Sequence, residues 1–374
     1  MKHILFTIIF SILFCMGASA QTDEPKKEKS SADKTQEIIQ KAFKYFPIPF
    51  AGYATETGLV LGVTKYNAFK IKGKILPDSM IKTSSILAYV YYTQEHQYKV
   101  YLNADIMHSD NKFNSKFEFL LLDYPSYYFG VGNENNFDSS YLVDFKNVMI
   151  APSVSYNVYE KIYLGAKYTF NNFINVESLN KEIGDSAIKV NEGLQSGFGL
   201  HLTREARNNR ITATKGSYLF ASYDFYASAF GSEFNYSQFS LDYRYYYSPI
   251  KRLTIASQLY TTISSGDVPI QSMPVVGGAY RMRGVYEARY RDNNMLMAQF
   301  ELRFPIIWII SGATYVGMGQ VSEHIKDYKF SDFHYGYGAG LRLLIDKTTS
   351  SVLRFDYSFG PAGNTIFIGF NEAF

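Results

Sequence analysis

Residues 277–294, GGAYRMRGVYEARYRDNN, hold the densest group of side chains that could take part in chemistry. The stretch carries four arginines, at positions 281, 283, 289 and 291, against only Glu287 and Asp292. Long segments without regular structure are usually either functional loops or disordered ones. The glycines and aromatic side chains favour a folded loop, so we expect its arginines to need acidic partners elsewhere in the chain.

Side-chain patterns that support enzyme chemistry are missing from the rest of the sequence. It has no GxSxG, HExxH or GxxxxGK[ST] pattern, and its six histidines never pair at the spacing of metal ligands. Cys15 is the only cysteine and is predicted to leave with a signal peptide, which excludes disulfides and thiolate catalysis. Asp105, His108 and Asp110 are interpreted as solvated loop ends. We therefore expect no enzyme activity, no metal and no cofactor.

The composition and the first residues indicate an exported membrane protein. Lys2 and His3, the apolar residues 4–14 and the small residues 18–20 predict a signal peptide over residues 1–20. The chain has 33 Tyr and 30 Phe, and its aromatic fraction is 17%. Mean hydropathy is only −0.15, and no second apolar run reaches ~18 residues, so helical membrane spans are not expected. The net charge of +3 is too small to indicate a nucleic-acid partner.

From Ala51 onward, apolar and polar residues alternate, which predicts an all-β transmembrane antiparallel barrel over residues 51–374. The apolar faces carry almost no charge over ~10 residues at a time, which favours a membrane barrel over a soluble sandwich. Gly336, Gly338 and Gly340 are interpreted as small lumen-facing residues that leave room for a plug. About sixteen strands are expected, near 52–66, 80–94, 96–108, 112–123, 126–137, 145–159, 160–174, 193–205, 214–229, 232–248, 250–265, 294–305, 309–321, 334–346, 349–360 and 363–374.

The connections between these strands predict which way the barrel faces. Long connections belong outside the cell in such barrels, and here they are expected at 67–79, 174–192, 266–293 and 322–333. Tight turns belong on the periplasmic side, and they are expected at Pro125-Ser126, Glu160-Lys161, Ser248-Pro249 and Lys347-Thr348. Residues 21–50 are predicted to form a periplasmic linker and a short amphipathic helix at 35–46. This helix either packs against the barrel rim, lies at the inner leaflet or plugs the pore.

Several segments resemble motifs of the BamA/TamA superfamily of outer-membrane assembly barrels (the bacterial surface antigen domain), over roughly residues 50–374. Within the arginine-rich loop, Met282-Arg283-Gly284-Val285-Tyr286 is similar to the (V/I)RG(Y/F) signature of the family's sixth outer loop. The residues before residue 51 are too few for the periplasmic POTRA modules, so the resemblance implies a POTRA-less member. The other similar segments are 53–62 (YATETGLVLG), 128–133 (YFGVGN), 204–216 (REARNNRITATKG), 299–306 (QFELRFPI) and the alternating end of the chain up to Phe374.

One departure from the family pattern bears on the loop arginine. In the family, a strand of the form F(V/I)DxG supplies an acid that pairs with this arginine inside the lumen. The matching segment here is 315–319, YVGMG, and Gly317 stands in the place of the acid. Because an unpaired arginine inside a barrel would cost several kcal/mol, another partner is expected. Glu301 is predicted to be the chief partner of Arg283, with Asp356 as second choice.

The resemblance implies insertion or translocation of proteins, or of lipid, at the outer membrane of a Gram-negative cell, with the N-terminus in the periplasm. The mechanism would depend on a weak lateral seam between the first and last strands, whose unpaired edges can pair with a strand of the client protein. Outer-membrane lipids and lipopolysaccharide are the expected partners, an accessory lipoprotein or periplasmic protein is left open, and the barrel is expected to be monomeric. The seam is expected to join 53–65 to 364–374, at Gly58, Gly62, Gly369 and Phe374.

Two other classes of function stay open from the sequence. The first is a passive channel or transporter for small, anionic solutes, with a lumen lined by Lys161, Lys167, Arg244 and Arg342. The second is a structural surface barrel that anchors a partner. A plugged assembly barrel should conduct poorly until the loop is removed, whereas an open channel should conduct from the outset.

Overall fold

Antiparallel strands make up most of the unit that runs from Gln40 to Phe374. The structure, a computed structural model, describes residues 31–54, 58–77, 80–135, 140–178, 192–361 and 363–374. The predicted signal peptide and the start of the predicted linker, residues 1–30, lie outside the described residues. A second unit ends at Ile39 and includes the first part of helix α2 (Ser31–Tyr45). In the part of the chain that is described, no helix is both long and apolar enough to cross a membrane.

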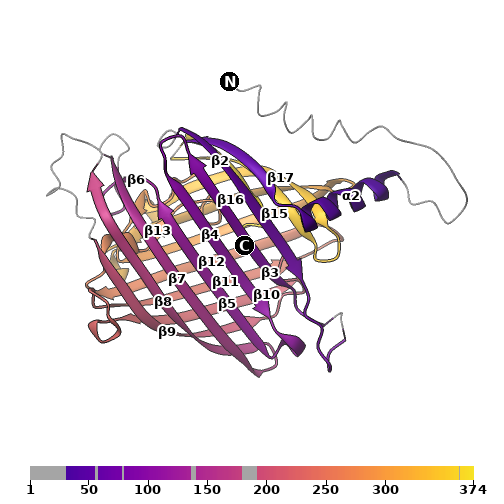
Figure 1. Ribbon diagram of the computed structural model, residues 1–374, viewed down its shortest axis with the longest axis horizontal. Coiled ribbons are helices and arrows are strands. Elements are labelled where there is room, and N and C mark those ends of the chain that lie inside the picture. The colour runs from indigo at the N-terminus through magenta and orange to yellow at the C-terminus, as the bar shows by residue number, and fades with distance from the viewer. Residues whose placement is uncertain (1–30, 55–57, 78–79, 136–139, 179–191, 362) are drawn as a thin grey trace, which may run out of the picture. The chain divides into compact units, whose positions relative to one another are not determined.

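The described residues form sixteen main strands in one antiparallel sheet (Figure 1). A further strand, β6 (Ser126–Tyr128), adds three residues beside β7. β9 pairs with β10, and each main strand from β2 to β18 pairs with the main strand before it and the one after it along the chain. The predicted all-β barrel with a short helix near its N-terminus is thus confirmed. The main strands are β1 (Ile48–Ala54), β2 (Gly58–Phe69), β3 (Ser84–Thr93), β4 (Tyr98–Met107), β5 (Phe113–Asp123), β7 (Tyr141–Tyr159), β8 (Ile162–Ser178), β9 (Gly193–Glu205), β10 (Gly216–Tyr226), β11 (Tyr236–Tyr247), β12 (Thr254–Gly266), β15 (Asn294–Ile307), β16 (Ile310–Ser322), β17 (His334–Asp346), β18 (Ser351–Gly360) and β19 (Gly363–Phe370).

The predicted number of strands is reached by two errors that cancel. The segment expected as one strand at 52–66 is a hairpin, in which β1 pairs with β2 from Ile48↔Thr64 to Ala54↔Gly58. Gly58 begins β2 with φ +64°, a left-handed conformation that glycine adopts without strain. The segment expected as a strand at 126–137 instead holds the short β6 and irregular chain after it.

The extra hairpin reverses the direction of β3, β4 and β5 relative to the prediction. We call the end of the barrel with connections 94–97, 124–140, 227–235, 267–293 and 323–333 the loop end, and the end with 70–83, 108–112, 160–161, 206–215, 248–253, 308–309 and 347–350 the turn end. Residues 67–79 were expected beside the arginine-rich loop, but their connection lies at the turn end, where Lys82 Nζ donates to the Glu205 carbonyl oxygen at 3.0 Å. Pro125-Ser126 was expected among the tight turns, but it lies at the loop end.

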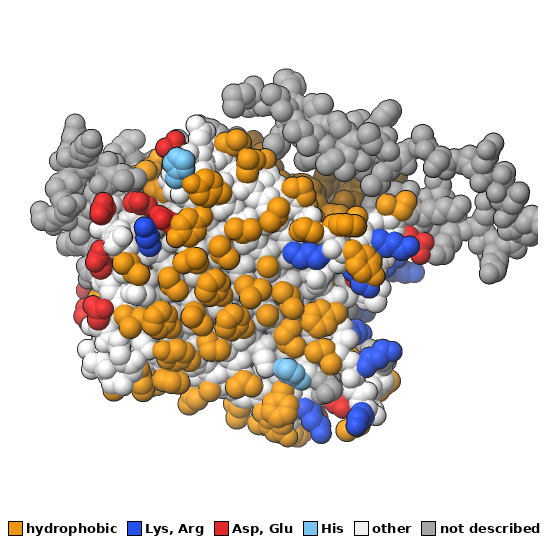
Figure 2. Space-filling model, viewed as in Figure 1, with side chains coloured by type: hydrophobic (Ala, Val, Ile, Leu, Met, Phe, Trp, Pro, Cys, Tyr) orange, Lys and Arg blue, Asp and Glu red, His pale blue; other side chains and the backbone are white. Residues whose placement is uncertain are grey.

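The outer face of the barrel is apolar across the strands. Side chains with the same parity along a strand point outward, as in β2, where Leu59, Leu61 and Val63 are exposed while Val60 and Gly62 are not. Figure 2 shows hydrophobic side chains spread over one face, with Lys and Arg gathered toward one end and Asp and Glu toward the other. Such an apolar band between two charged rims is the surface that a membrane-spanning barrel presents to lipid.

Candidate functional site in the lumen

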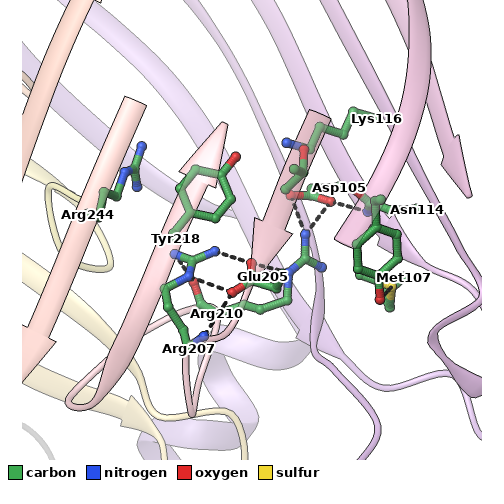
Figure 3. A pocket seen from close by; sticks show the side chains of 11 residues that line it. Asp105, Met107, Asn114, Lys116, Glu205, Arg207, Arg210, Tyr218 and Arg244 are labelled. Atoms are coloured by element: carbon green, nitrogen blue, oxygen red, sulfur yellow. Dashed lines mark hydrogen bonds and ion pairs between the residues drawn. The ribbon is translucent and has the colours of Figure 1, made fainter. Parts of the chain in front are cut away.

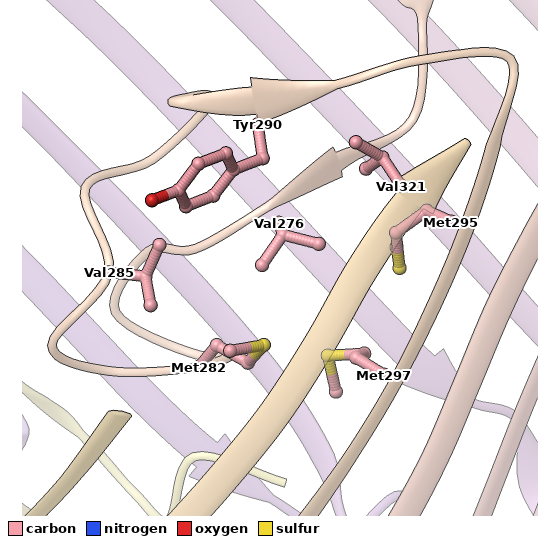
Figure 4. Packing of buried hydrophobic residues seen from close by; sticks show 7 residues of the cluster. All are labelled: Val276, Met282, Val285, Tyr290, Met295, Met297 and Val321. Carbon is pink, nitrogen blue, oxygen red and sulfur yellow. The ribbon is translucent and has the colours of Figure 1, made fainter. Parts of the chain in front are cut away.

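The loop between β12 and β15 folds into the lumen and is held there by an apolar cluster (Figure 4). Within the loop, β13 (Val275–Val276) pairs with β14 (Tyr290–Arg291) and gives it a framework. Its buried side chains pack against methionines and a valine on the inner wall of β15 and β16. Because the cluster removes all of these groups from water, it fixes the loop to the barrel wall. Its members are Val276, Met282, Val285, Tyr290, Met295, Met297 and Val321.

Glycines let the tip of the loop touch the backbone of the barrel. Gly284 has φ +100°, and a Cβ there would collide with the carbonyl oxygen of Phe359. In return, a Cβ at Gly360 would meet the Gly284 carbonyl oxygen, and one at Gly336 would meet that of Arg283. The glycines at 284, 336 and 360 therefore allow a close approach that any side chain would block. The reading of Gly336 as a small residue that makes room for a plug agrees with this packing.

Arg283 lies at the centre of a buried ion-pair network. Its side chain is fully removed from solvent, and it donates to Glu301 Oε2 through Nη2 and to Asp356 Oδ2 through Nη1, each at 2.6 Å. Its guanidinium carbon lies 3.5 Å from the ring centroid of Tyr315. Glu301 was expected as the chief partner and Asp356 as the second choice, but the two carboxylates share Arg283 at equal distance.

The network extends beyond the residues that the sequence singled out. Arg303 donates to Glu301 Oε1 at 2.7 Å, and Arg342 contacts Asp356 Oδ1 at 2.5 Å and Glu372 Oε2 at 2.8 Å. Arg354 lies 3.6 Å from Asp356 and donates to the Ala279 carbonyl oxygen at 3.2 Å. In the described part of the chain, the network holds four arginines and three carboxylates: Arg283, Arg303, Arg342, Arg354, Glu301, Asp356 and Glu372.

Gly317, which stands where the family has its acid, lies under the loop. A Cβ there would be 3.3 Å from Met282 Cγ, closer than most real Cβ contacts. The neighbouring Gly319 is still tighter, because a Cβ would overlap the Met282 sulfur. Met282 therefore fills the space beside Gly317 and Gly319, and two carboxylates on β15 and β18 contact the arginine.

A second segment, between β5 and β7, packs on the arginine-rich loop. The rings of Tyr127 and Phe129 lie 6.1 and 5.5 Å from that of Tyr286. The backbone N–H of Gly132 donates to the Arg291 carbonyl oxygen at 2.8 Å. The segment at 128–133, which resembles a family motif, therefore contributes to the structure that fills the loop end.

The connection 206–215, which also resembles a family motif, crosses the turn end. Its Asn209 side chain donates to the Thr349 carbonyl oxygen at 3.1 Å, and its Thr212 hydroxyl donates to that of Ser350 at 2.7 Å. These acceptors lie in the connection between β17 and β18, well separated from 206–215 in sequence. The arginine-rich loop thus lies in the lumen toward the loop end, and the 206–215 connection reaches 347–350 at the turn end.

Phe374 does not lie on the outer surface as a strand residue, although the alternation before it predicts that. The strand β19 ends at Phe370, and Asn371 adopts a left-handed conformation, φ +63°, that turns the following residues inward. Phe374 is 6% exposed and packs with Tyr246, and its carbonyl oxygen accepts from Arg303 at 3.0 Å. It therefore belongs to the lumen and not to the seam.

The lateral seam runs between β19 and the β1–β2 hairpin. Among the described residues, no residue register joins β19 to β1 or β2. Near the turn end, beyond the register with β1, Tyr66 stacks on Phe370 with ring centroids 5.2 Å apart. Gly58 and Gly62 were expected at the seam, but β1 covers this part of β2. Gly369 lies on β19, and its nearest neighbour inside the barrel is Arg354.

The end of α2 is bound close to this seam at the turn end. Lys65 Nζ of β2 donates to the carbonyl oxygens of Phe43, Lys44 and Phe46 at 3.0, 2.8 and 3.1 Å. The Gln40 side chain donates to Asp346 Oδ1 of β17 at 2.5 Å. The ring of Phe43 meets that of Phe370 edge to face, with centroids 6.5 Å apart. Residues 40–46 therefore pack against the rim of the barrel, which was one of the three alternatives for this helix.

The fold is a membrane barrel whose arginine-bearing loop folds into the lumen. Comparison with known proteins shows which family of barrels the chain belongs to. The model of the Omp85 superfamily domain matches residues 91–370, about three quarters of the chain. The chain therefore belongs to the Omp85 superfamily, whose barrels lie in bacterial outer membranes, as the resemblance to its BamA/TamA members implies. A comparison with curated protein sequences finds no match.

Solved structures show the same fold at low sequence identity. BamA from Haemophilus ducreyi lacking POTRA domains 1–3 matches with a TM-score of 0.51 and 14% identity, over 94% of this chain and 79% of that one. CdiB from Escherichia coli matches with a TM-score of 0.56 and 12% identity, over 86% and 60%. CdiB from Acinetobacter baumannii matches with a TM-score of 0.51 and 12% identity, over 87% and 59%. The chain thus spans about three fifths of each CdiB structure.

Proposed function

We propose that this barrel assists the insertion or translocation of proteins, or of lipid, at the outer membrane through its lateral seam. The observation that carries the proposal is the seam itself. Every main strand from β2 to β18 is paired on both sides, whereas no register among the described residues joins β19 to the hairpin beside it. An unpaired strand edge offers backbone donors and acceptors that a client strand can extend.

The contacts inside the barrel support the wall as the route for a client. The arginine-rich loop packs in the lumen at one end, and the 206–215 connection reaches 347–350 at the other. In this proposal the loop end faces the cell exterior and the turn end faces the periplasm, where outer-membrane barrels have their shorter connections.

The lumen contacts weigh against a passive channel for anions. Of the cations that were expected to line it, Lys167 pairs with Asp224 at 2.8 Å and Arg244 with Asp242 at 2.6 Å. Arg342 is shared by Asp356 and Glu372, so its charge is neutralised as well. These three of the expected cations are therefore paired and offer no free positive charge to a passing solute. No contact favours a purely structural anchor either.

The proposal is tested by locking the seam. In proteoliposomes that contain the mature chain, a Tyr66→Cys/Phe370→Cys pair is joined by a short bismaleimide across the stacked rings. The readouts are the folding rate of an unfolded eight-stranded outer-membrane barrel added from outside and the transfer of a fluorescent phospholipid between leaflets. We expect the unmodified barrel to accelerate at least one of them over empty liposomes, and the cross-link to remove the acceleration.

The matched control is Tyr243→Cys/Leu259→Cys, a pair of outward-facing register partners on β11 and β12, cross-linked in the same way. Because these strands are already joined by backbone hydrogen bonds, this cross-link should leave both rates unchanged. Rates equal to those of empty liposomes for both readouts, or acceleration that survives the seam cross-link, would contradict the proposal.

A further inference from the structure

A cavity of about 220 Å³ lies inside the barrel near the turn end, apart from the Arg283 network (Figure 3). Strands β4, β5, β8, β9, β10 and β11 and the 206–215 connection line it. The lining residues are mostly polar or charged. Empty cavities in proteins are usually lined by apolar side chains, whereas polar cavities usually hold water or another polar molecule. Asp105, which was interpreted as a solvated loop end, lies in this wall and accepts two bonds from Arg210 at 2.8 Å.

Positive charge exceeds negative charge around this cavity. Arg210 pairs with Asp105, Arg207 with Glu205, and Arg244 with Asp242. Lys82 donates to the Glu205 carbonyl oxygen, and Lys116 adds a further ammonium to the wall. Among the described residues that form the cavity and their direct partners, five cations thus face three carboxylates. Uncompensated charge inside a protein is costly, so an excess of positive charge here favours the binding of an anion.

Some donors in the wall are not used by the protein. Lys116 Nζ lies 5.5 Å from the ring centroid of Phe220, and no carboxylate of the described residues lies within ion-pair distance of it. Arg244 uses Nε and Nη2 on Asp242, which leaves Nη1 without a described acceptor. Tyr218 lies between them, under the guanidinium groups of Arg207 and Arg244, and in Figure 3 its hydroxyl points into the same space.

We propose that this cavity binds a phosphate group, held by Lys116, Arg244 and the Tyr218 hydroxyl. The donors are those that proteins use for phosphate, since ammonium and guanidinium groups form short charge-assisted bonds to its oxygens. The excess of two positive charges matches a phosphate monoester, which carries about −1.5 to −2 at pH 7. The group could be free inorganic phosphate or the monoester headgroup of a lipid such as phosphatidic acid, since both present the same dianion. This inference does not depend on the seam.

The test is a binding titration on the folded, detergent-solubilised barrel. Isothermal calorimetry is run with inorganic phosphate and, separately, with short-chain phosphatidic acid, each against chloride at equal ionic strength. We expect saturable binding of at least one ligand. Lys116→Met should weaken it by at least about tenfold, the effect of losing one charged hydrogen bond. Tyr218→Phe should weaken it less, because a neutral hydroxyl contributes a weaker bond.

The matched control is Lys99→Met, which removes a lysine of the adjacent β4 that does not line the cavity. It should bind like the wild type, and folding of every variant is checked by its heat-dependent gel mobility. Binding of phosphate that is lost in Lys116→Met assigns the free anion as ligand, and binding of phosphatidic acid alone with the same loss assigns the headgroup. Absence of binding to both ligands, or equal binding by Lys116→Met and wild type, overturns the proposal.

Discussion

In the Arg283 network, we expect removal of an acid to destabilise the barrel more than removal of Arg283. Glu301 also contacts Arg303 and Arg342, and Asp356 also contacts Arg342, so Arg283→Met leaves neither carboxylate without an arginine. Glu301→Gln is more severe, because it takes a carboxylate contact from Arg283, Arg303 and Arg342 at once.

The magnitudes follow from the burial of the groups. Arg283 and Glu301 have fully buried side chains, and leaving a charge uncompensated in such a place costs about 3–5 kcal/mol. We expect Glu301→Gln to lower the free energy of unfolding by that amount. Arg283→Met loses two charge-assisted hydrogen bonds without creating an unpaired charge. We therefore expect it to lower the free energy of unfolding by about 1–3 kcal/mol. The double variant should fall short of the sum by about 0.5–3 kcal/mol, as contacting residues do.

The assay is urea unfolding of the barrel in lipid vesicles, followed by the fluorescence of Trp308, the only tryptophan of the chain. Arg281→Met is the control, since this loop arginine stacks on Tyr260 and has no ion pair among the described residues. Arg281→Met should lower the free energy of unfolding by less than about 1 kcal/mol. The reasoning is refuted if Arg283→Met costs as much as Glu301→Gln, or if the two losses simply add.

Three further outcomes are expected. Gly284→Ala should expose the loop to protease and raise the conductance of the barrel in planar bilayers, because its Cβ meets the Phe359 carbonyl oxygen; Gly231→Ala, also at positive φ but in open space, should do neither. On intact cells an impermeant maleimide should label Asp327→Cys at the loop end and spare Thr348→Cys at the turn end, and the reverse pattern would invert the barrel. Burial lowers the pKa of Lys82 to about 8 from 10.5, so the unfolded chain binds that proton more tightly. Wild-type stability should therefore rise relative to Lys82→Met by about 3 kcal/mol between pH 8 and 10.5, and parallel pH profiles of the two proteins would rule this out.

Local alternation predicted the barrel and the inward direction of its acids well. The period of two depends only on neighbouring residues, so it shows that Glu301 and Asp356 face the lumen without any knowledge of distant contacts. It does not show how far apart two inward residues lie. For this reason the equal sharing of Arg283, and the participation of Arg354 and Glu372, emerged only from the structure.

Where the prediction failed, one residue with special backbone geometry had redirected the chain. Gly58 begins the second strand of a hairpin inside a run that alternates like one strand, and this shifted β3, β4 and β5 to the opposite direction. Asn371 turns the last residues into the lumen although the alternation continues toward Phe374. A left-handed residue changes direction without changing the hydrophobic pattern, so a pattern-based prediction misses it.

The contacts of α2 have a mechanical consequence. Residues 40–46 are attached on one side to β17 and β19, through Gln40 and Phe43, and on the other side to β2, through Lys65. Separation of β19 from β2 must break one set of these attachments. By reciprocity, any molecule that pulls these residues off the rim lowers the energy of opening by the amount that the attachments contribute. Detachment of residues 40–46 from the rim and opening of the wall between β19 and β2 are therefore energetically coupled, although neither involves the lumen.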